Sequence, residues 1–127
     1  MSRLTLGVLA VCALVGLGGA GARASTPPHP ARMLVYAQEW SLWNSRSALP
    51  HGKVIVQLWN RGQDAHDLRI RRLDRHGRLV GRAQGVAVTV SGTRRQATWR
   101  LAAGRYELYC SMPGHYQHGM HAVLVVR

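Results

Sequence analysis

Short runs in which apolar and polar residues alternate are the feature that most constrains the fold of this chain. In the run 54–59, Val54, Val56 and Leu58 occupy alternate positions, so they share one face of an extended strand. Five further runs show the same period of two and are bounded by turn residues. These runs are Leu68–Arg71, Val86–Val90, Ala97–Leu101, Arg105–Cys110 and Met120–Val126. Neither an internal repeat nor an amphipathic helical stretch accompanies them, so the pattern predicts an all-β fold, a sandwich or a barrel.

The first 24 residues have the pattern of a secretory signal peptide. Arg3 supplies the positive start, an apolar run follows, and Ala22-Arg23-Ala24 forms a cleavage site before Ser25. An uncleaved anchor is the alternative, because the uncharged stretch between residues 4 and 22 is long enough to span a membrane. We expect cleavage, and therefore a secreted or periplasmic protein with no stable membrane insertion.

Cleavage leaves a Pro-rich linker, residues 25–31, followed by a single domain, residues 32–127. Only one cysteine, Cys110, is then left, which excludes a disulfide scaffold. Loss of Arg3 and Arg23 lowers the formal charge from +12 to about +10. A charge of this size is compatible with nucleic acid, anionic surfaces or acidic proteins as partners.

Three side chains with metal-binding donor atoms follow one another at five-residue spacing, namely Cys110, His115 and Met120. Cys110 ends one predicted strand and Met120 begins the next, while Pro113-Gly114 allows the loop between them to fold back tightly. Thiolate and thioether ligands favour Cu(I), imidazole binds both Cu(I) and Cu(II), and zinc rarely binds methionine. The three side chains therefore predict a site for one copper ion.

A second histidine would complete a His₂Cys set with a weak axial methionine, the arrangement of blue-copper electron-transfer sites. His66 is the best candidate, because it lies in the turn just before the predicted strand Leu68–Ile70. His118 and His121 lie closer in sequence to Cys110, but their spacing fits the pattern less well. The predicted metal ligands are His66, Cys110, His115 and Met120.

Each of these residues also has a simpler interpretation. Cys110 on an inward face is compatible with an inert core thiol and Met120 with ordinary core packing. His66 is compatible with a hydrogen-bonded turn residue, and His115, next to Tyr116, with a plain surface loop residue. A catalytic pair of Cys110 and His115 would need an oxyanion site and an orienting third group, which the sequence does not place. The arginines between residues 69 and 82 are typical of a solvated strand face, and no nucleic-acid-binding motif accompanies them. We expect neither an enzyme nor a nucleic-acid-binding protein.

Two blocks, Asn60–Leu68 and Tyr109–Met120, resemble the cupredoxins, the small blue copper proteins of the plastocyanin and azurin kind. The resemblance extends from about Ala37 to Arg127 and implies an eight-stranded Greek-key β-sandwich with copper at one end. It places the family's ligands on the four residues named above. It also implies that His115 is the exposed ligand, framed by Met112, Pro113 and Tyr116.

Two departures from the cupredoxin pattern stand out. Asp67 follows the first histidine, where the family commonly has Asn, and one extra residue separates His115 from Met120 relative to the azurin-type loop. We predict that the Asp67 carboxylate accepts a hydrogen bond from the hydroxyl or amide of Ser111, the role of the family's Asn. The Met112 N–H is expected to reach the Cys110 thiolate.

The resemblance implies a monomeric carrier of single electrons between redox partners, through one copper that cycles between Cu(II) and Cu(I). A copper-trafficking or copper-sequestering protein with the same ligands and no redox turnover is the alternative, and a metal-free interaction module is a third. The positive charge predicts an acidic redox partner, attracted over a range that salt limits to about 8–10 Å.

Overall fold

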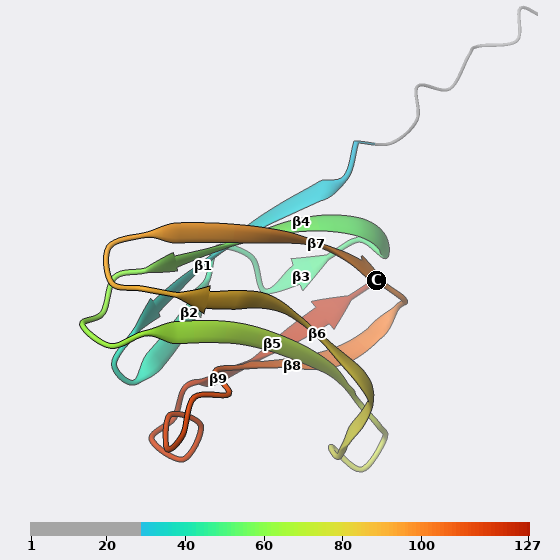
Figure 1. Ribbon diagram of the computed structural model, residues 1–127. Coiled ribbons are helices and arrows are strands. Elements are labelled where there is room, and N and C mark those ends of the chain that lie inside the picture. The colour runs from blue at the N-terminus through green and yellow to red at the C-terminus, as the bar shows by residue number, and fades with distance from the viewer. Residues whose placement is uncertain (1–28) are drawn as a thin grey trace, which may run out of the picture.

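The computed structural model describes residues 29–127 (Figure 1). The predicted leader and most of the predicted linker lie outside the described residues. The described part consists of strands joined by turns and loops, and it contains no helix long and apolar enough to cross a membrane. The strands are β1 (Ala31–Gln38), β2 (Ser41–Asn44), β3 (Ala48–Leu49), β4 (Gly52–Asn60), β5 (His66–Leu73), β6 (Leu79–Thr89), β7 (Arg94–Leu101), β8 (Gly104–Tyr109) and β9 (His121–Val126).

These strands form two sheets packed face to face, which confirms the predicted all-β sandwich. One sheet has the order β2-β1-β4-β7 and the other has the order β3-β9-β8-β5-β6. β1 pairs with β4 in parallel and β3 pairs with β9 in parallel, whereas the other pairs are antiparallel. The parallel pairing of β1 places Ala37 beside Asn60, so the β1–β2 turn lies at the same end of the sandwich as the β4–β5 loop.

The core lies between the two sheets, on the faces that the alternating pattern predicts. Val54, Val56 and Leu58 of β4 are fully buried, and Leu68 of β5 is fully buried on the facing sheet. Side chains of this size contribute about 1.5–3 kcal/mol each when they are buried. Trp99 of β7 is the largest fully buried side chain among the described residues, and it packs into the same cluster. Many of the intervening positions carry polar residues that are exposed or half-buried, such as Lys53 and Gln57 of β4, whereas Ile55 and Trp59 of β4 are half-buried.

The structure departs from the sequence-based expectation in its first elements and in its strand count. β1, β2 and β3 lie in a region where the pattern had predicted no individual strand. The described part has nine strands, where the resemblance implies eight. β3 has only two residues and ends before Pro50, whose nitrogen cannot donate to a sheet. His66, which we had expected in a turn, is the first residue of β5 and pairs with Thr89.

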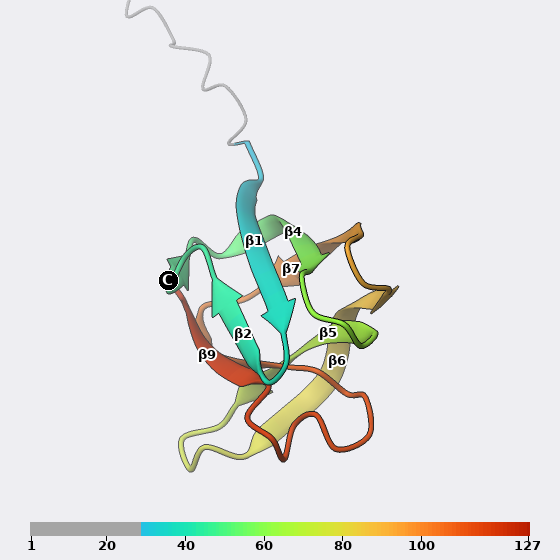
Figure 2. The ribbon, with the colours of Figure 1, turned by 90° about the vertical axis from the view of Figure 1, so that its left-hand side faces the viewer.

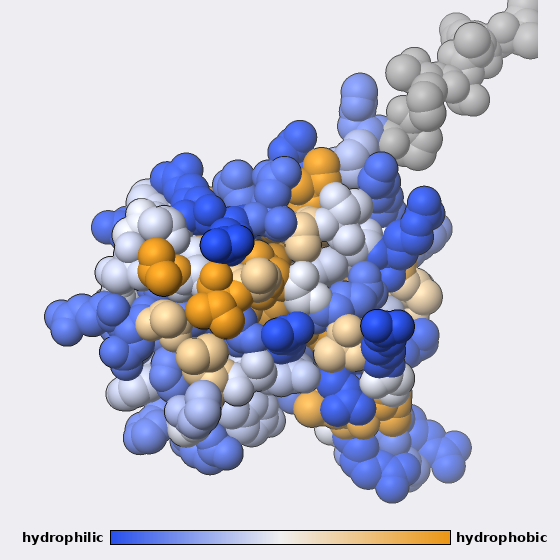
Figure 3. Space-filling view, viewed as in Figure 1, coloured by the Kyte–Doolittle hydropathy of each residue, from blue (hydrophilic) through white to orange (hydrophobic). Residues whose placement is uncertain are grey.

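Gln84 links the two sheets where β6 and β7, the last strands of their sheets, run past each other. Its side-chain amide donates to the Arg100 carbonyl at 3.1 Å and accepts from the Arg100 N–H at 3.2 Å. The side chain thereby satisfies backbone groups that a strand edge would otherwise leave open to another chain. On the face shown in Figure 3, hydrophilic side chains predominate and apolar ones form only small separate patches.

Candidate metal centre

Two loops at one end of the sandwich carry the predicted ligands. The β4–β5 loop is held by Asn60, whose side chain donates to the carbonyls of Asp64 and Thr89 and accepts from the Gly62 N–H. These three bonds fix the chain just before His66, so that its side chain enters the sandwich interior, fully buried. In the second loop, Cys110 directly follows β8 and Met120 directly precedes β9.

The side chains of His66, Cys110 and His115 converge on one point. The Nδ1 atoms of the two histidines are 3.1 Å apart, and the Cys110 Sγ lies 3.5 Å from Nδ1 of His115 and 4.0 Å from Nδ1 of His66. All three side chains are buried, and among the described residues they form a group whose donor atoms lie within 4.8 Å of one another. Two imidazole nitrogens and a thiol that face one another in the buried interior fit a single copper ion. Bound copper supplies one-electron redox chemistry and keeps the thiol deprotonated.

Met120 closes the same loop from the interior side. Its side chain is fully buried, its N–H donates to the His115 carbonyl at 3.1 Å, and its carbonyl accepts from the Cys110 N–H at 3.1 Å. Backbone hydrogen bonds therefore join Met120 to both Cys110 and His115. This arrangement holds Met120 next to the residues that carry the converging donors, where its thioether would be available to a bound copper.

The predicted bond between Asp67 and Ser111 is present in both of its forms. The Asp67 carboxylate accepts from the Ser111 amide at 2.6 Å and from the Ser111 hydroxyl at 2.5 Å, and it also accepts from Nε of Arg69 at 2.8 Å. Burial alone would raise the pKa of Asp67, but these hydrogen bonds hold it below its ordinary value. The start of β5, which carries His66, is thus tied to the loop that carries Cys110.

The Cys110 thiol has the surroundings of a buried ligand. Burial raises its pKa, whereas backbone hydrogen bonds from Met112 and Asp67 act in the opposite direction. The contribution of Met112 has the direction that we expected from the sequence. Such bonds withdraw electron density from a metal-bound sulfur and favour the reduced ion.

Glu39, in the turn between β1 and β2, makes a contact with the site that the sequence reading missed. Its carboxylate accepts from Nε2 of His66 at 2.9 Å and from the backbone N–H groups of Gln63 and Asp64. Burial would raise the pKa of Glu39, but the backbone bonds from Asp64 and Gln63, together with the His66 bond, lower it to about 2. The one signal in the sequence that could have pointed to Glu39 is that the chain has only five acidic residues.

Trp40, the residue after Glu39, packs over His115, so the expectation that His115 is exposed is wrong. The resemblance implied an exposed His115 framed by three residues of its own loop, but His115 is only 9% exposed. The Trp40 ring meets the His115 ring edge-on, with centroids 5.1 Å apart, and stacks on His118 at 4.6 Å. Tyr116, expected in that frame, stacks instead on His121 at 4.7 Å. Parallel pairing of β1 with β4 carries Trp40 to this end of the molecule.

The two histidines considered as substitute ligands have other contacts. His118 bonds to the Gly114 carbonyl through Nδ1 at 2.7 Å, in addition to its stacking on Trp40. Nδ1 of His121 lies 3.2 Å from the Glu107 carboxylate. Neither belongs to the converging group of donors.

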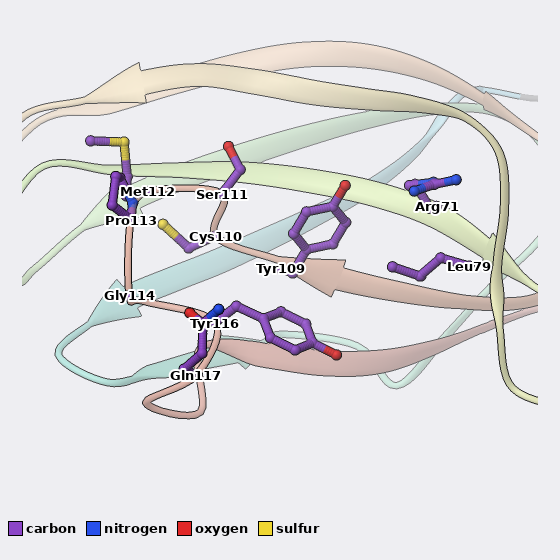
Figure 4. Close-up of a pocket in the computed structure, with 10 residues that line it drawn as sticks. All are labelled: Arg71, Leu79, Tyr109, Cys110, Ser111, Met112, Pro113, Gly114, Tyr116 and Gln117. Atoms are coloured by element: carbon purple, nitrogen blue, oxygen red, sulfur yellow. The ribbon is translucent and has the colours of Figure 1, made fainter.

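A shallow pocket of about 400 Å³ lies beside the metal-binding loop (Figure 4). Residues 109–114 of the loop line it together with Tyr116 and Gln117, and Arg71 and Leu79 line it from the neighbouring strands. In Figure 4 the Cys110 sulfur points away from the Arg71 end of this pocket. Solvent thus reaches the outer side of the loop, while the donor atoms themselves stay buried.

Comparison with known proteins identifies relatives at the level of family and fold. The sequence pattern of the "Sulfocyanin (SoxE) domain" family matches residues 30–127. None of the curated protein sequences matches the chain.

Several solved structures share the fold at low sequence identity. Auracyanin A, a "blue" copper protein from Chloroflexus aurantiacus, is 17% identical, with 78% of this chain and 100% of that chain covered and a TM-score of 0.61. Dithionite-reduced auracyanin from Roseiflexus castenholzii is 17% identical, with 79% and 99% covered and a TM-score of 0.60. Rusticyanin from Thiobacillus ferrooxidans is 19% identical, with 76% of each chain covered and a TM-score of 0.61.

The two-sheet sandwich, with a buried His-Cys-His group at one end and Met120 beside it, defines a cupredoxin, a blue copper protein whose cofactor is one copper ion. Within that class, the chain belongs to the sulfocyanin (SoxE) domain family. The resemblance stated from the sequence is therefore confirmed.

Proposed function

We propose that this protein carries single electrons between redox partners outside the cytoplasm, with its copper alternating between Cu(II) and Cu(I). The observation that carries the proposal is the convergence of two Nδ1 atoms and one Sγ in a buried space. A site that keeps one geometry in both oxidation states needs little rearrangement when an electron arrives. This is the property required of a carrier.

In this proposal His66, Cys110 and His115 supply the three strong ligands, and Met120 supplies the weak axial one. Separate contacts brace the first three: Glu39 contacts His66, the Cys110 N–H donates to the Met120 carbonyl, and Trp40 packs on His115. Ligands braced from different elements resist displacement together. Such bracing supports a carrier that binds copper permanently, rather than a trafficking protein that must release it.

The protein is proposed to perform no bond-making chemistry of its own. Two of the structural relatives, auracyanin and rusticyanin, have been crystallised in reduced form. Their reduction supports a one-electron role for the shared fold. Export is proposed from the signal peptide pattern of residues 1–24.

The partner is proposed to be an acidic redox protein that approaches a monomer of this chain. The support is the formal charge of +12 for the whole sequence, although the loops around the site carry few of these charges. Electron-transfer rates with acidic and basic redox proteins, measured against ionic strength, test this part. An acidic partner whose rate does not fall as salt rises would contradict it.

Addition of Cu(II) to the purified protein tests the function itself. We expect an intense visible thiolate-to-copper band that a reductant bleaches and an oxidant restores. Tight, colourless binding of Cu(I) alone would favour copper trafficking instead. Absence of copper binding would leave only the interaction module.

A further inference from the structure

The β1–β2 turn, which contains none of the four predicted ligands, contacts both imidazoles of the site. Glu39 bonds to His66 and Trp40 packs against His115. Figure 2 shows this turn between β1 and β2 running close to the loop that joins β8 to β9. Two consecutive residues therefore contact ligands that come from two different loops.

The Glu39 carboxylate is held in place by more than the histidine. Its oxygens accept from the Gln63 N–H at 3.0 and 3.1 Å and from the Asp64 N–H at 2.9 Å, so the β4–β5 loop binds it with two backbone donors. Gly62 makes room for it, because a Cβ atom at Gly62 would collide with the carboxylate. The side chain is 24% exposed and reaches a His66 ring that is fully buried.

This geometry fixes which nitrogen of His66 faces the metal. A carboxylate accepts a hydrogen bond but cannot donate one, so the proton of the neutral imidazole must lie on Nε2. Nδ1 then keeps its lone pair, and Nδ1 is the atom that points toward Cys110 and His115. A carboxylate behind a ligand imidazole also makes that imidazole a stronger electron donor.

We propose that Glu39 is a positioning residue of the copper site, which sets the tautomer of His66 and favours Cu(II) over Cu(I). Glu39 contacts His66, and its neighbour Trp40 packs against the other imidazole. The effect of Glu39 on the His66 tautomer can be measured on the apoprotein alone. The preference for Cu(II) rests on the proposed redox function, because it is measured as a reduction potential.

The test compares Glu39→Gln with Asp74→Asn. The first removes the charge next to His66 and keeps the size of the side chain, whereas the second removes a carboxylate of similar exposure from the β5–β6 turn. In Glu39→Gln we expect Cu(II) binding to weaken about tenfold relative to Cu(I). For a one-electron couple this raises the potential by ~59 mV. The visible band should remain, and Asp74→Asn should keep the wild-type potential.

A second measurement is independent of electron transfer. In the wild-type apoprotein, nitrogen NMR shifts should show His66 protonated at Nε2, and in Glu39→Gln a mixture with the Nδ1-protonated form should appear. Glu39→Asp, which is one methylene shorter, serves if Glu39→Gln does not fold, and it should show the same mixture. An unchanged tautomer together with a potential equal to that of Asp74→Asn would overturn the proposal. If the copper protein shows no reversible redox couple but the His66 tautomer still shifts in Glu39→Gln, the proposed function is refuted and the positioning role of Glu39 stands.

Discussion

Replacement of Asp67 by Ala tests the link between the two loops of the copper site. The substitution removes the acceptor of two hydrogen bonds from Ser111 and of one from Arg69. Bonds to a charged group contribute about 1.5–3 kcal/mol each, and the lower end applies because Ser111 is exposed. The pair with Arg69 adds no more than about 1 kcal/mol, since the Arg69 side chain is 41% exposed.

Loss of the carboxylate also removes the cost of burying a charge, so we expect a net loss of ~2 kcal/mol in the free energy of unfolding. For a domain of this size, that loss lowers the melting temperature of the apoprotein by about 10 °C. Copper should also leave the variant faster when a chelator competes for it, because the loop that carries Cys110 is no longer tied to β5.

Two variants serve as controls for this measurement by urea denaturation. Asp67→Asn keeps an acceptor for the Ser111 amide and should lose less than half as much stability. Asp64→Ala removes an exposed carboxylate from the neighbouring loop and should unfold like the wild type. If Asp67→Ala unfolds at the same urea concentration as Asp64→Ala, the link between the loops contributes nothing to stability and the reasoning fails.

Three further predictions concern the ligands and one carboxylate of the β5–β6 turn. Cys110→Ser should abolish the intense visible band, because that band belongs to the bond between sulfur and copper; absorption spectroscopy checks this, and an unchanged band would refute the ligand assignment. Met120→Leu should keep a coloured site and raise its potential in voltammetry, since loss of a weak donor disfavours Cu(II); a lower potential would contradict an axial role. Hydrogen bonds from the Arg78 and His76 backbone hold the pKa of Asp74 below its ordinary value of 3.8. The β5–β6 turn is therefore stabilised above that pH and should loosen as the pH falls through the lowered pKa, seen as faster amide exchange at Arg78 with no change at β4.

The strands in which apolar and polar residues alternate were predictable from local pattern. β4 and β8 alternate strictly, because one face of each strand packs into the core and the other meets water. The Cys110–Met120 loop was also predictable, since three of its side chains carry donor atoms and the loop is bounded by two strands. His66 could be selected because the chemistry of the site required a second imidazole.

Glu39 and Trp40 were not predictable in this way. Their contacts with His66 and His115 depend on the parallel pairing of β1 with β4, which joins segments that are distant in sequence. No local period encodes such a pairing, and a carboxylate before a tryptophan has no signature of a metal site. For the same reason, the exposure of His115 was wrongly expected, since the residue that covers it comes from another part of the chain.

β1 also separates the point where the chain enters the domain from the copper site. The strand starts at Ala31 and its eight residues, at about 3.3 Å each, carry the chain roughly 25 Å to the end where copper binds. Figure 1 shows the chain entering the domain at the end away from the metal-binding loops. If the leader is retained as a membrane anchor, the attachment point and the copper lie at opposite ends of the domain.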